Sequence, residues 1–244
     1  MMNSMKILVF ISLFITNVLV HGAPVNVGVL NFAPPFSSLA GENHYYGFTI
    51  DLMDNICKRI NTECVYKSAT MSRQFEQLEQ GTIDISFLPI PISSKIPEQF
   101  IYSLPYLASN GQFLALEDSN IKTAGDIKNY KIGVVQDTLY PILADSNFAR
   151  VNTIKGYPNI TDMLTGLQNR DVDVIYVNAS VARFIINNAM LHFKSIGNRI
   201  TMGQGYGILA LKKNAALIEK INNALVDMEA DGTYLKIYNQ YFSK

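Results

Sequence analysis

The chain has 244 residues, with twenty Lys and Arg against twenty Asp and Glu, and a formal net charge of zero. This balance, without a run of Lys or Arg, argues against nucleic acid or an anionic membrane surface as a partner. The length allows one large domain or two lobes of roughly 100 residues each.

The N-terminal segment has the pattern of a secretory signal peptide. Lys6 precedes an apolar run from Ile7 to Val20, and a small-residue cleavage pattern with Gly22 follows it. The run is shorter than the ~20 residues that cross a bilayer, which disfavours a membrane anchor. We expect residues 1–22 to be removed, which leaves a mature net charge of about −1 through the loss of Lys6.

The first half of the mature chain alternates strands and helices. β-Branched, alternating segments predict strands, and apolar side chains at helical spacing predict helices. The predicted elements are strands over residues 25–30, 64–66 and 83–87 and helices over residues 50–60 and 75–79. This order favours an α/β layer with a mostly parallel sheet.

Cys57 and Cys64 are the only two cysteines. A lone pair in an exported protein is usually a disulfide, and we expect these residues to be bonded. A metal site would need more ligands than two sulfurs, and no histidine stands at a suitable spacing. The sequence therefore predicts no metal and no cofactor.

The second half repeats the strand–helix–strand order of the first half. We predict strands over residues 131–135 and 172–177 and a helix over residues 162–167. Two α/β lobes of similar construction follow, with limits at residues 23–109 plus 204–244 for lobe 1 and residues 110–203 for lobe 2.

Two segments are expected to cross between these lobes and form a hinge. Residues 112–116 would leave the first lobe as a strand, and residues 206–211 would return to it. Residues 215–238 are predicted to be helical, with one polar face, and to dock on the first lobe. Because ligands of open α/β sheets lie beyond the carboxyl ends of strands, the cleft should be lined by residues just after Leu30, Phe87, Val135 and Val177.

Enzyme motifs are scarce in this chain. There is no nucleophile elbow, phosphate-binding glycine loop or dinucleotide fingerprint. Asp84 and Asp173 could be read as an acid and base pair, but each stands at the start of a buried strand in a different lobe. A surface or capping role is favoured for both, since catalysis would require a shared pocket. We therefore expect a binding protein and not an enzyme.

Two loops could contact a ligand. Phe32 follows the first strand and could offer a flat aromatic wall, whereas Phe36 is expected to fill the core. Residues 136–140 follow a second-lobe strand and precede a helical stretch. Free N–H groups and the Thr138 hydroxyl there could bind a carboxylate, with an ordinary helix cap by Asp137 or Thr138 as the alternative.

Five stretches of the chain have the order and spacing of a known family. They are Gly47-Phe48-Thr49-Ile50-Asp51-Leu52, Cys57-Lys58-Arg59-Ile60-Asn61-Thr62-Glu63-Cys64, Ser103-Leu104-Pro105-Tyr106, Gly133-Val134-Val135-Gln136 and Asp231-Gly232-Thr233-Tyr234. Together they resemble the periplasmic binding proteins for lysine, arginine, ornithine and histidine. The resemblance implies a type II periplasmic binding protein with a ligand cleft between two lobes, a disulfide at the paired cysteines, and delivery of the ligand to the permease of an ABC importer. It covers essentially all of the mature chain.

The carboxylate-binding positions of that family are altered here. The Arg that holds the α-carboxylate of the ligand matches Ile96, with Lys95 beside it as a substitute and Arg73 as another. Lys is a point charge and not a bidentate fork, so its geometry would differ. Pro91 stands where the family donates a backbone N–H, which Pro lacks.

The ammonium-binding and side-chain positions are altered as well. The Asp that binds the α-ammonium matches Asn178, and an acidic residue that meets a cationic side chain matches Leu30. An apolar pocket is expected from Leu30, Met71, Leu88, Pro89 and Tyr140, with Leu139 beside it. An unpaired cation would be costly there, so a basic amino acid is disfavoured.

The sequence thus predicts a monomeric periplasmic solute-binding protein that captures an amino-acid-like molecule for an ABC importer. Two alternatives stay open. One is a periplasmic dehydratase of prephenate-like acids on the same fold, which the loss of Arg at Ile96 argues against. The other is a sensory adaptor whose closed form is read by a receptor.

Overall fold

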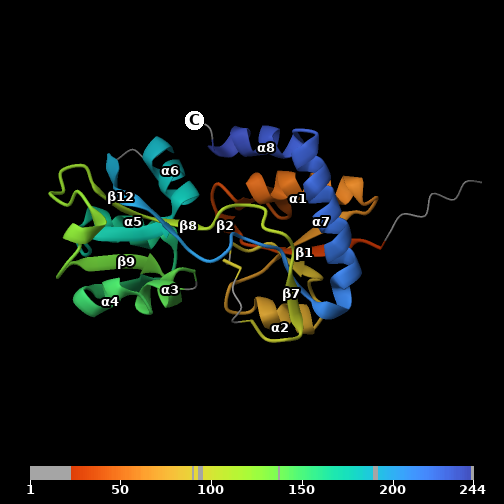
Figure 1. Ribbon diagram of the computed structural model, residues 1–244, viewed down its shortest axis with the longest axis horizontal. Helices are drawn as coiled ribbons and strands as arrows, with labels where there is room; N and C mark the ends of the chain where they lie inside the picture. Colours follow the sequence, from red (N-terminus) through yellow and green to blue (C-terminus); the bar gives the residue numbers. More distant parts are fainter. Residues whose placement is uncertain (1–22, 90, 93–95, 137, 189–191, 243–244) are drawn as a thin grey trace, which may run out of the picture.

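The computed structural model describes residues 23–89, 91–92, 96–136, 138–188 and 192–242. Two α/β bodies lie side by side, each built around its own five-stranded sheet (Figure 1). The predicted signal peptide lies outside the described residues. No helix of the described part is long and apolar enough to cross a membrane.

The first sheet belongs to the lobe that contains the N-terminal strand. Its order is β5 (Cys64–Ser68), β1 (Val25–Val29), β6 (Ile85–Ser86), β13 (Leu209–Leu211) and β7 (Phe100–Tyr102). β1 pairs in parallel with β5 and β6, while β13 is antiparallel to β6 and β7. The predicted strand–helix–strand order is confirmed, although the strand expected over residues 83–87 is paired regularly only at Ile85–Ser86.

The second sheet is built in the same way. Its order is β10 (Thr153–Tyr157), β9 (Lys131–Val135), β11 (Val174–Asn178), β8 (Asn110–Leu116) and β12 (Phe193–Thr201). β9 pairs in parallel with β10 and β11, and β8 runs antiparallel to β11 and β12. A small third sheet, which was not predicted, joins β2 (Phe32–Ala33), β3 (Ser37–Ala40) and β4 (His44–Tyr46).

Helices cover the faces of both sheets (Figure 1). In the first lobe they are α1 (Phe48–Arg59), α2 (Gln74–Glu79), the 3-10 turn η2 (Lys212–Asn214), α7 (Ala215–Ala230) and α8 (Thr233–Phe242). In the second they are η1 (Ala124–Asp126), α3 (Tyr140–Ala144), α4 (Asn147–Val151), α5 (Ile160–Gln168) and α6 (Ala179–Asn188). The tail is helical as predicted, but it forms two helices, because Gly232, at a φ of +81°, separates α7 from α8.

Burial explains why these segments form these elements. The apolar positions of α1 and α7, among them Leu52, Ile56 and Leu225, pack with strand residues such as Val27 and Ala210 into one core. Gly47 precedes α1 at a φ of +129°, and a Cβ there would lie 2.3 Å from the carbonyl oxygen of Phe36. Only glycine fits this close approach, which fixes the loop that leads from the first strand to α1.

The two lobes are joined by two segments that bond to each other. The first segment leads from the first lobe into β8, which lies in the second sheet. The second segment leads from the second lobe back into β13, which lies in the first sheet. Tyr206 N–H donates to the Leu107 carbonyl at 2.7 Å, and Tyr106 N–H donates to the Tyr206 carbonyl at 2.8 Å. Met202 N–H donates to the Ser109 carbonyl at 2.8 Å. The two predicted crossings are therefore present and bonded to each other, but the first lies before residues 112–116, which belong to β8 in the second sheet and do not cross.

Candidate functional site

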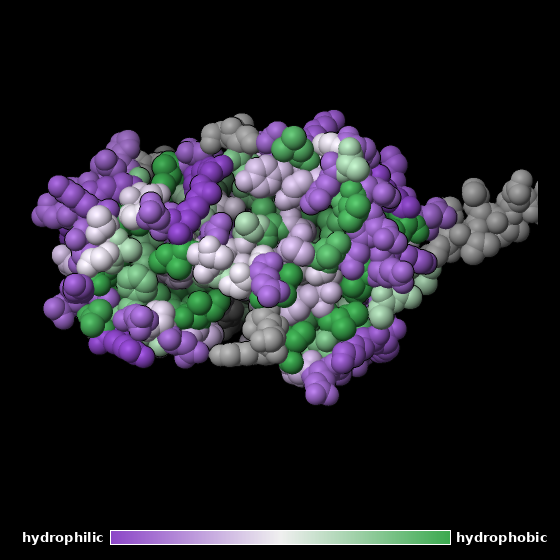
Figure 2. Space-filling view, in the orientation of Figure 1, coloured by the Kyte–Doolittle hydropathy of each residue, from purple (hydrophilic) through white to green (hydrophobic). Residues whose placement is uncertain are grey.

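A cavity of about 260 Å³ lies between the two lobes. Figure 2 shows a hollow between the two halves of the molecule. The first lobe and its crossing segment contribute Leu30, Phe32, Ala33, Pro34, Phe36, Thr70, Met71, Pro89 and Tyr206, and the second contributes Val135, Thr138, Leu139, Pro158, Asn159, Ile160, Met163, Tyr176, Val177, Asn178 and Val181.

Strand ends explain why these residues meet. In the first lobe β1 and β6 are parallel, and in the second lobe β9, β10 and β11 are parallel. The carboxyl ends of these strands therefore lie at one edge of each sheet, where ligands of such sheets bind. All four strand ends named from the sequence contribute a lining residue. Residues 158–160 were missed because the strand β10 before them was not predicted.

The structure brings seven of the thirteen predicted site residues to this cavity. They are Leu30, Phe32, Met71, Pro89, Thr138, Leu139 and Asn178. Five others lie elsewhere, and Lys95 lies outside the described residues, so nothing is said of its position. Contact of the seven with a ligand remains a prediction.

Five predicted site residues do not line the cavity, and four of these make contacts elsewhere in the protein. Leu88 is buried in a first-lobe cluster, and Ile96 packs against the same cluster. Pro91 is buried and forms a β-bridge with Tyr206. Tyr140 packs against the core of the second lobe. Their partners include residues that line the cavity, since Met71 belongs to the first-lobe cluster, Leu139 to the second-lobe core, and Tyr206 itself lines the cavity.

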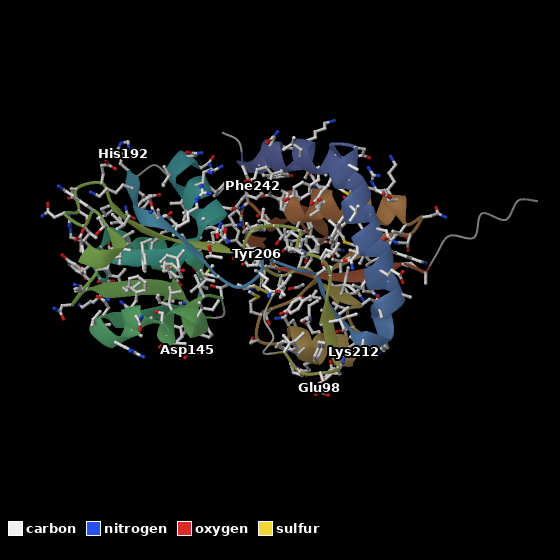
Figure 3. The ribbon with its side chains drawn as sticks, in the orientation of Figure 1. Glu98, Asp145, His192, Tyr206, Lys212 and Phe242 are labelled. Atoms are coloured by element: carbon white, nitrogen blue, oxygen red, sulfur yellow. A yellow bond between two sulfur atoms is a disulfide. The ribbon has the colours of Figure 1, made fainter. Side chains whose placement is uncertain are left out.

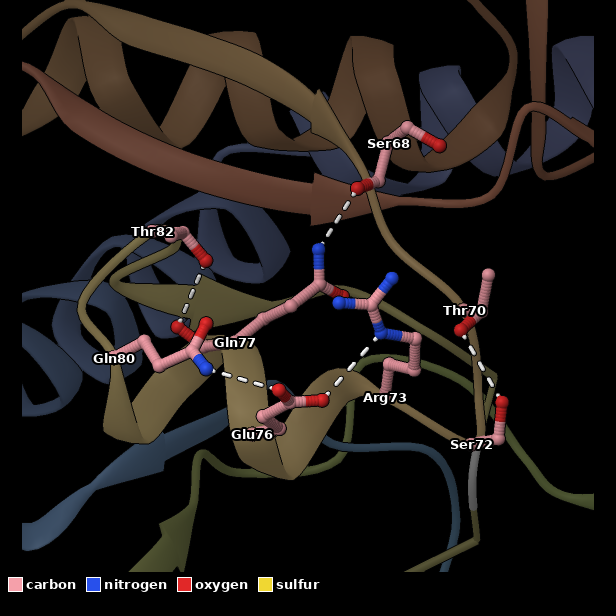
Figure 4. A network of polar contacts seen from close by, with 8 residues as sticks. All are labelled: Ser68, Thr70, Ser72, Arg73, Glu76, Gln77, Gln80 and Thr82. Atoms are coloured by element: carbon pink, nitrogen blue, oxygen red, sulfur yellow. Dashed lines mark hydrogen bonds and ion pairs between the residues drawn. The ribbon is translucent and has the colours of Figure 1, made fainter.

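Arg73, the fifth, lies at the surface beside α2. Its Nε is 3.4 Å from Oε2 of Glu76, and the Arg side chain is 65% exposed (Figure 4). Because this ion pair is exposed, it holds the guanidinium only weakly.

Asn178 ends β11 and stands directly before α6. Its Oδ1 accepts the backbone N–H of Ser180 at 2.7 Å and that of Val181 at 3.4 Å, as in a helix N-cap. Its Nδ2 donates to the Tyr206 hydroxyl at 2.6 Å. The amide thus connects the second lobe to the crossing segment, and its oxygen is already used by the protein.

Tyr206 is the functional candidate that the sequence analysis missed. It lies at the junction of the lobes (Figure 3), is fully buried, and lines the cavity with Asn178. Its hydroxyl is protonated at neutral pH, as in any tyrosine, and burial raises its pKa further. No acceptor for that proton is found among the residues described. The hinge position was the only signal in the sequence, and it did not single out a tyrosine.

The loop before α3 does not have the predicted capping arrangement. The Thr138 hydroxyl donates to the Val135 carbonyl at 3.1 Å, and the residue that precedes α3 is Leu139, without a side-chain cap. Capping by Thr138 is therefore wrong, since its hydroxyl closes a turn instead. Asp137 lies outside the described residues.

Two predictions on aromatic and acidic residues can be compared with the structure. Phe36 is 2% exposed and packs against Phe48 and Phe242, so its core role is confirmed, although it also reaches the cavity.

Asp84 accepts from the backbone N–H of Asn26 at 2.8 Å, and Asp173 from that of Lys131 at 2.8 Å. Each carboxylate fixes the first parallel strand of its own lobe, outside the cavity.

The predicted disulfide between Cys57 and Cys64 is present. It joins the last turn of α1 to the start of β5, away from the cavity. Among the described residues, no group of three or more His, Cys, Asp or Glu side chains could hold a metal ion.

Comparison with known proteins identifies the family of this chain. Residues 25–244 match the model of the bacterial extracellular solute-binding proteins, family 3. The chain is 28% identical over 221 residues to the ABC transporter arginine-binding protein 1 of Escherichia coli. The matched region covers 89% of this chain and 90% of that relative.

Solved structures agree in fold. An arginine transport system periplasmic binding protein from Legionella pneumophila is 35% identical, with a TM-score of 0.82, over 91% of this chain and all of the other. An ancestral arginine-binding protein bound to glutamine is 28% identical, with a TM-score of 0.78, over 91% of this chain and 98% of the other.

Proposed function

Because this chain belongs to the bacterial extracellular solute-binding proteins of family 3, we propose that it captures an amino-acid-like molecule between its lobes and delivers it to the permease of an ABC importer. The observation that carries the proposal is the interlobe cavity, which is lined from both sheets. A ligand held from both sides binds the closed arrangement better than the open one, and this difference drives closure.

The size of the cavity fits this role. About 260 Å³ lies just under the range of about 300–1,000 Å³ that is typical of small-molecule sites. A single amino acid or a close derivative is therefore a better match than a peptide or a nucleotide. The relatives named above as arginine-binding proteins support the amino-acid class. The name of the Legionella pneumophila protein, a periplasmic binding protein, supports the periplasm as the place of action.

The contacts of the ligand are part of the proposal. We assign them to the seven predicted side chains at the cavity, with Lys95 or Arg73 in place of the family's carboxylate-binding Arg. Arg73 can leave its exposed partner Glu76 at little cost in free energy.

Binding without turnover is proposed for the same site. A dehydratase of prephenate-like acids would hold two carboxylates, and no described side chain that lines the cavity is cationic. A sensory role has no separate observation in its favour.

A thermal-shift screen against amino acids, their derivatives and prephenate-like acids tests the function. A ligand present at a hundred times its Kd should raise the free energy of unfolding by about 2.7 kcal/mol. Conversion of an acid by the protein would contradict the binding role, and the absence of any stabilising compound would contradict the ligand class.

A further inference from the structure

We propose that this site selects an amino acid with an uncharged aliphatic or thioether side chain, and that the Tyr206 hydroxyl donates a hydrogen bond to its carboxylate. The inference rests on the proposed function and deepens it, because it names the class of ligand and a binding residue.

Apolar groups make up most of the cavity wall. The first lobe presents Leu30, Phe32, Met71 and Pro89, and the second presents Leu139, Met163 and Val181. Phe32 is 61% exposed and stands at the rim. A side chain of carbon and sulfur atoms gains from leaving water against such a wall, and the flexible Met71 and Met163 adapt to its shape.

The polar side chains of the wall are mostly occupied within the protein. Asn159 is bonded to Asp162 through both ends of its amide, and Thr138 is bonded to the Val135 carbonyl. The Asn178 oxygen caps α6. A ligand with a polar side chain would have to break these contacts or leave its own groups unpaired.

No described residue of the wall carries a charge. A guanidinium or ammonium group enclosed there would lose its hydration without gaining a carboxylate partner. At Leu30, the position that meets the cation in basic-amino-acid binders, the side chain is half-buried and packs against the first-lobe core.

Tyr206 supplies the polar contact that the apolar wall lacks. Its hydroxyl oxygen accepts from the Nδ2 of Asn178 at 2.6 Å, so the hydroxyl proton is directed elsewhere. A tyrosine hydroxyl is protonated at neutral pH, so the group is a donor there. An anionic carboxylate is the strongest acceptor that an amino acid offers to it.

Calorimetric titration of the secreted protein with L-norleucine and L-lysine tests the proposal. The two have straight side chains of similar length and differ in the terminal ammonium. We expect norleucine to bind about 100-fold more tightly or better. Lysine binding as tightly as norleucine overturns the specificity but leaves the proposed function standing, whereas failure of every amino acid to bind overturns both.

A matched pair of variants tests the missing charge directly. Leu30→Asp places a carboxylate in the wall, and Leu30→Asn changes the shape in the same way without the charge. The Asp variant should bind lysine about tenfold or more tightly than the Asn variant does. Equal lysine binding by two folded variants overturns the role of charge at this position, and the norleucine and lysine comparison on the unaltered protein decides the matter if either fails to fold.

Discussion

At the scale of single residues, the hydrogen bond between Asn178 and Tyr206 connects the two halves of the site. Asn178 belongs to the second lobe and caps α6, while Tyr206 belongs to the segment that crosses back to the first lobe. Sequence comparison gave Asn178 a direct ligand role. In the structure its amide caps α6 and holds the tyrosine beside the cavity, and its contact with the ligand stays a prediction.

Removal of the Tyr206 hydroxyl should weaken binding. Tyr206→Phe keeps the ring packing and removes one hydrogen bond to the ligand, so we expect a loss of about 3- to 10-fold in affinity, measured by calorimetry. Tyr106→Phe is the control, because the Tyr106 hydroxyl is buried without a partner among the described residues and lies outside the cavity. An equal effect in both variants would show that Tyr206 does not contact the ligand.

Asn178→Ala should lower both stability and affinity. The lost cap of α6 is worth about 1 kcal/mol of unfolding free energy, and Tyr206 also loses its partner. Ser146→Ala is a matched control, since Ser146 caps α4 through the N–H of Phe148 and does not line the cavity. We expect the control to lose stability in urea titration but not affinity. Unchanged affinity in Asn178→Ala would remove this residue from the site.

At the scale of elements, the sequence predicts segments with regular periodicity best. The strands at Val25–Val29 and Lys131–Val135 and the helix α1 show clear alternation or helical spacing, and all three are found close to their predicted limits. β12 and β2 were missed, because β12 is largely exposed and irregular and β2 has only two residues. Their pairing depends on neighbouring strands that are distant in the sequence, which a local pattern does not contain.

The disulfide stabilises the junction of α1 and β5 without reaching the cavity. Cys57→Ser should reduce the unfolding free energy by about 2–3 kcal/mol, because the short loop is no longer closed in the unfolded chain. Affinity for the ligand should stay within error when it is measured well below the melting temperature. A large loss of affinity with full stability would contradict the structural role.

The break between α7 and α8 predicts a pH effect. Bonds from the Thr233 hydroxyl and N–H, together with Arg59, lower the pKa of Asp231 to about 2. Asp231 is ionised more readily in the folded chain, so its contribution to stability is present above its ordinary pKa of 3.8 and lost as the pH falls toward about 2. The difference in melting temperature between the unaltered protein and Asp231→Asn should therefore shrink from pH 6 to pH 2. A constant difference would mean that the carboxylate charge plays no part.

At the scale of the whole molecule, two similar α/β lobes joined by two bonded crossings explain how an apolar site can form and still admit a ligand. Each lobe has its own core, so the crossing segments are the natural place for movement. The general position of the cleft could be predicted from strand ends, because parallel strands expose their carboxyl ends together. Tyr206 could not be predicted, because it reaches the cavity only through the packing of one lobe against the other. Residues 158–160 were missed together with the strand β10 that precedes them.

The claim that the ligand lies between the lobes is tested most directly by filling the cavity. Thr70 is exposed and lines the cavity, whereas Ser72 is exposed nearby and does not line it. In calorimetric titration with the best compound of the amino-acid screen, Thr70→Trp should lower affinity at least about tenfold, because the indole occupies ligand volume. Ser72→Trp should bind as the unaltered protein does. Undiminished binding by a folded Thr70→Trp protein would contradict the interlobe site.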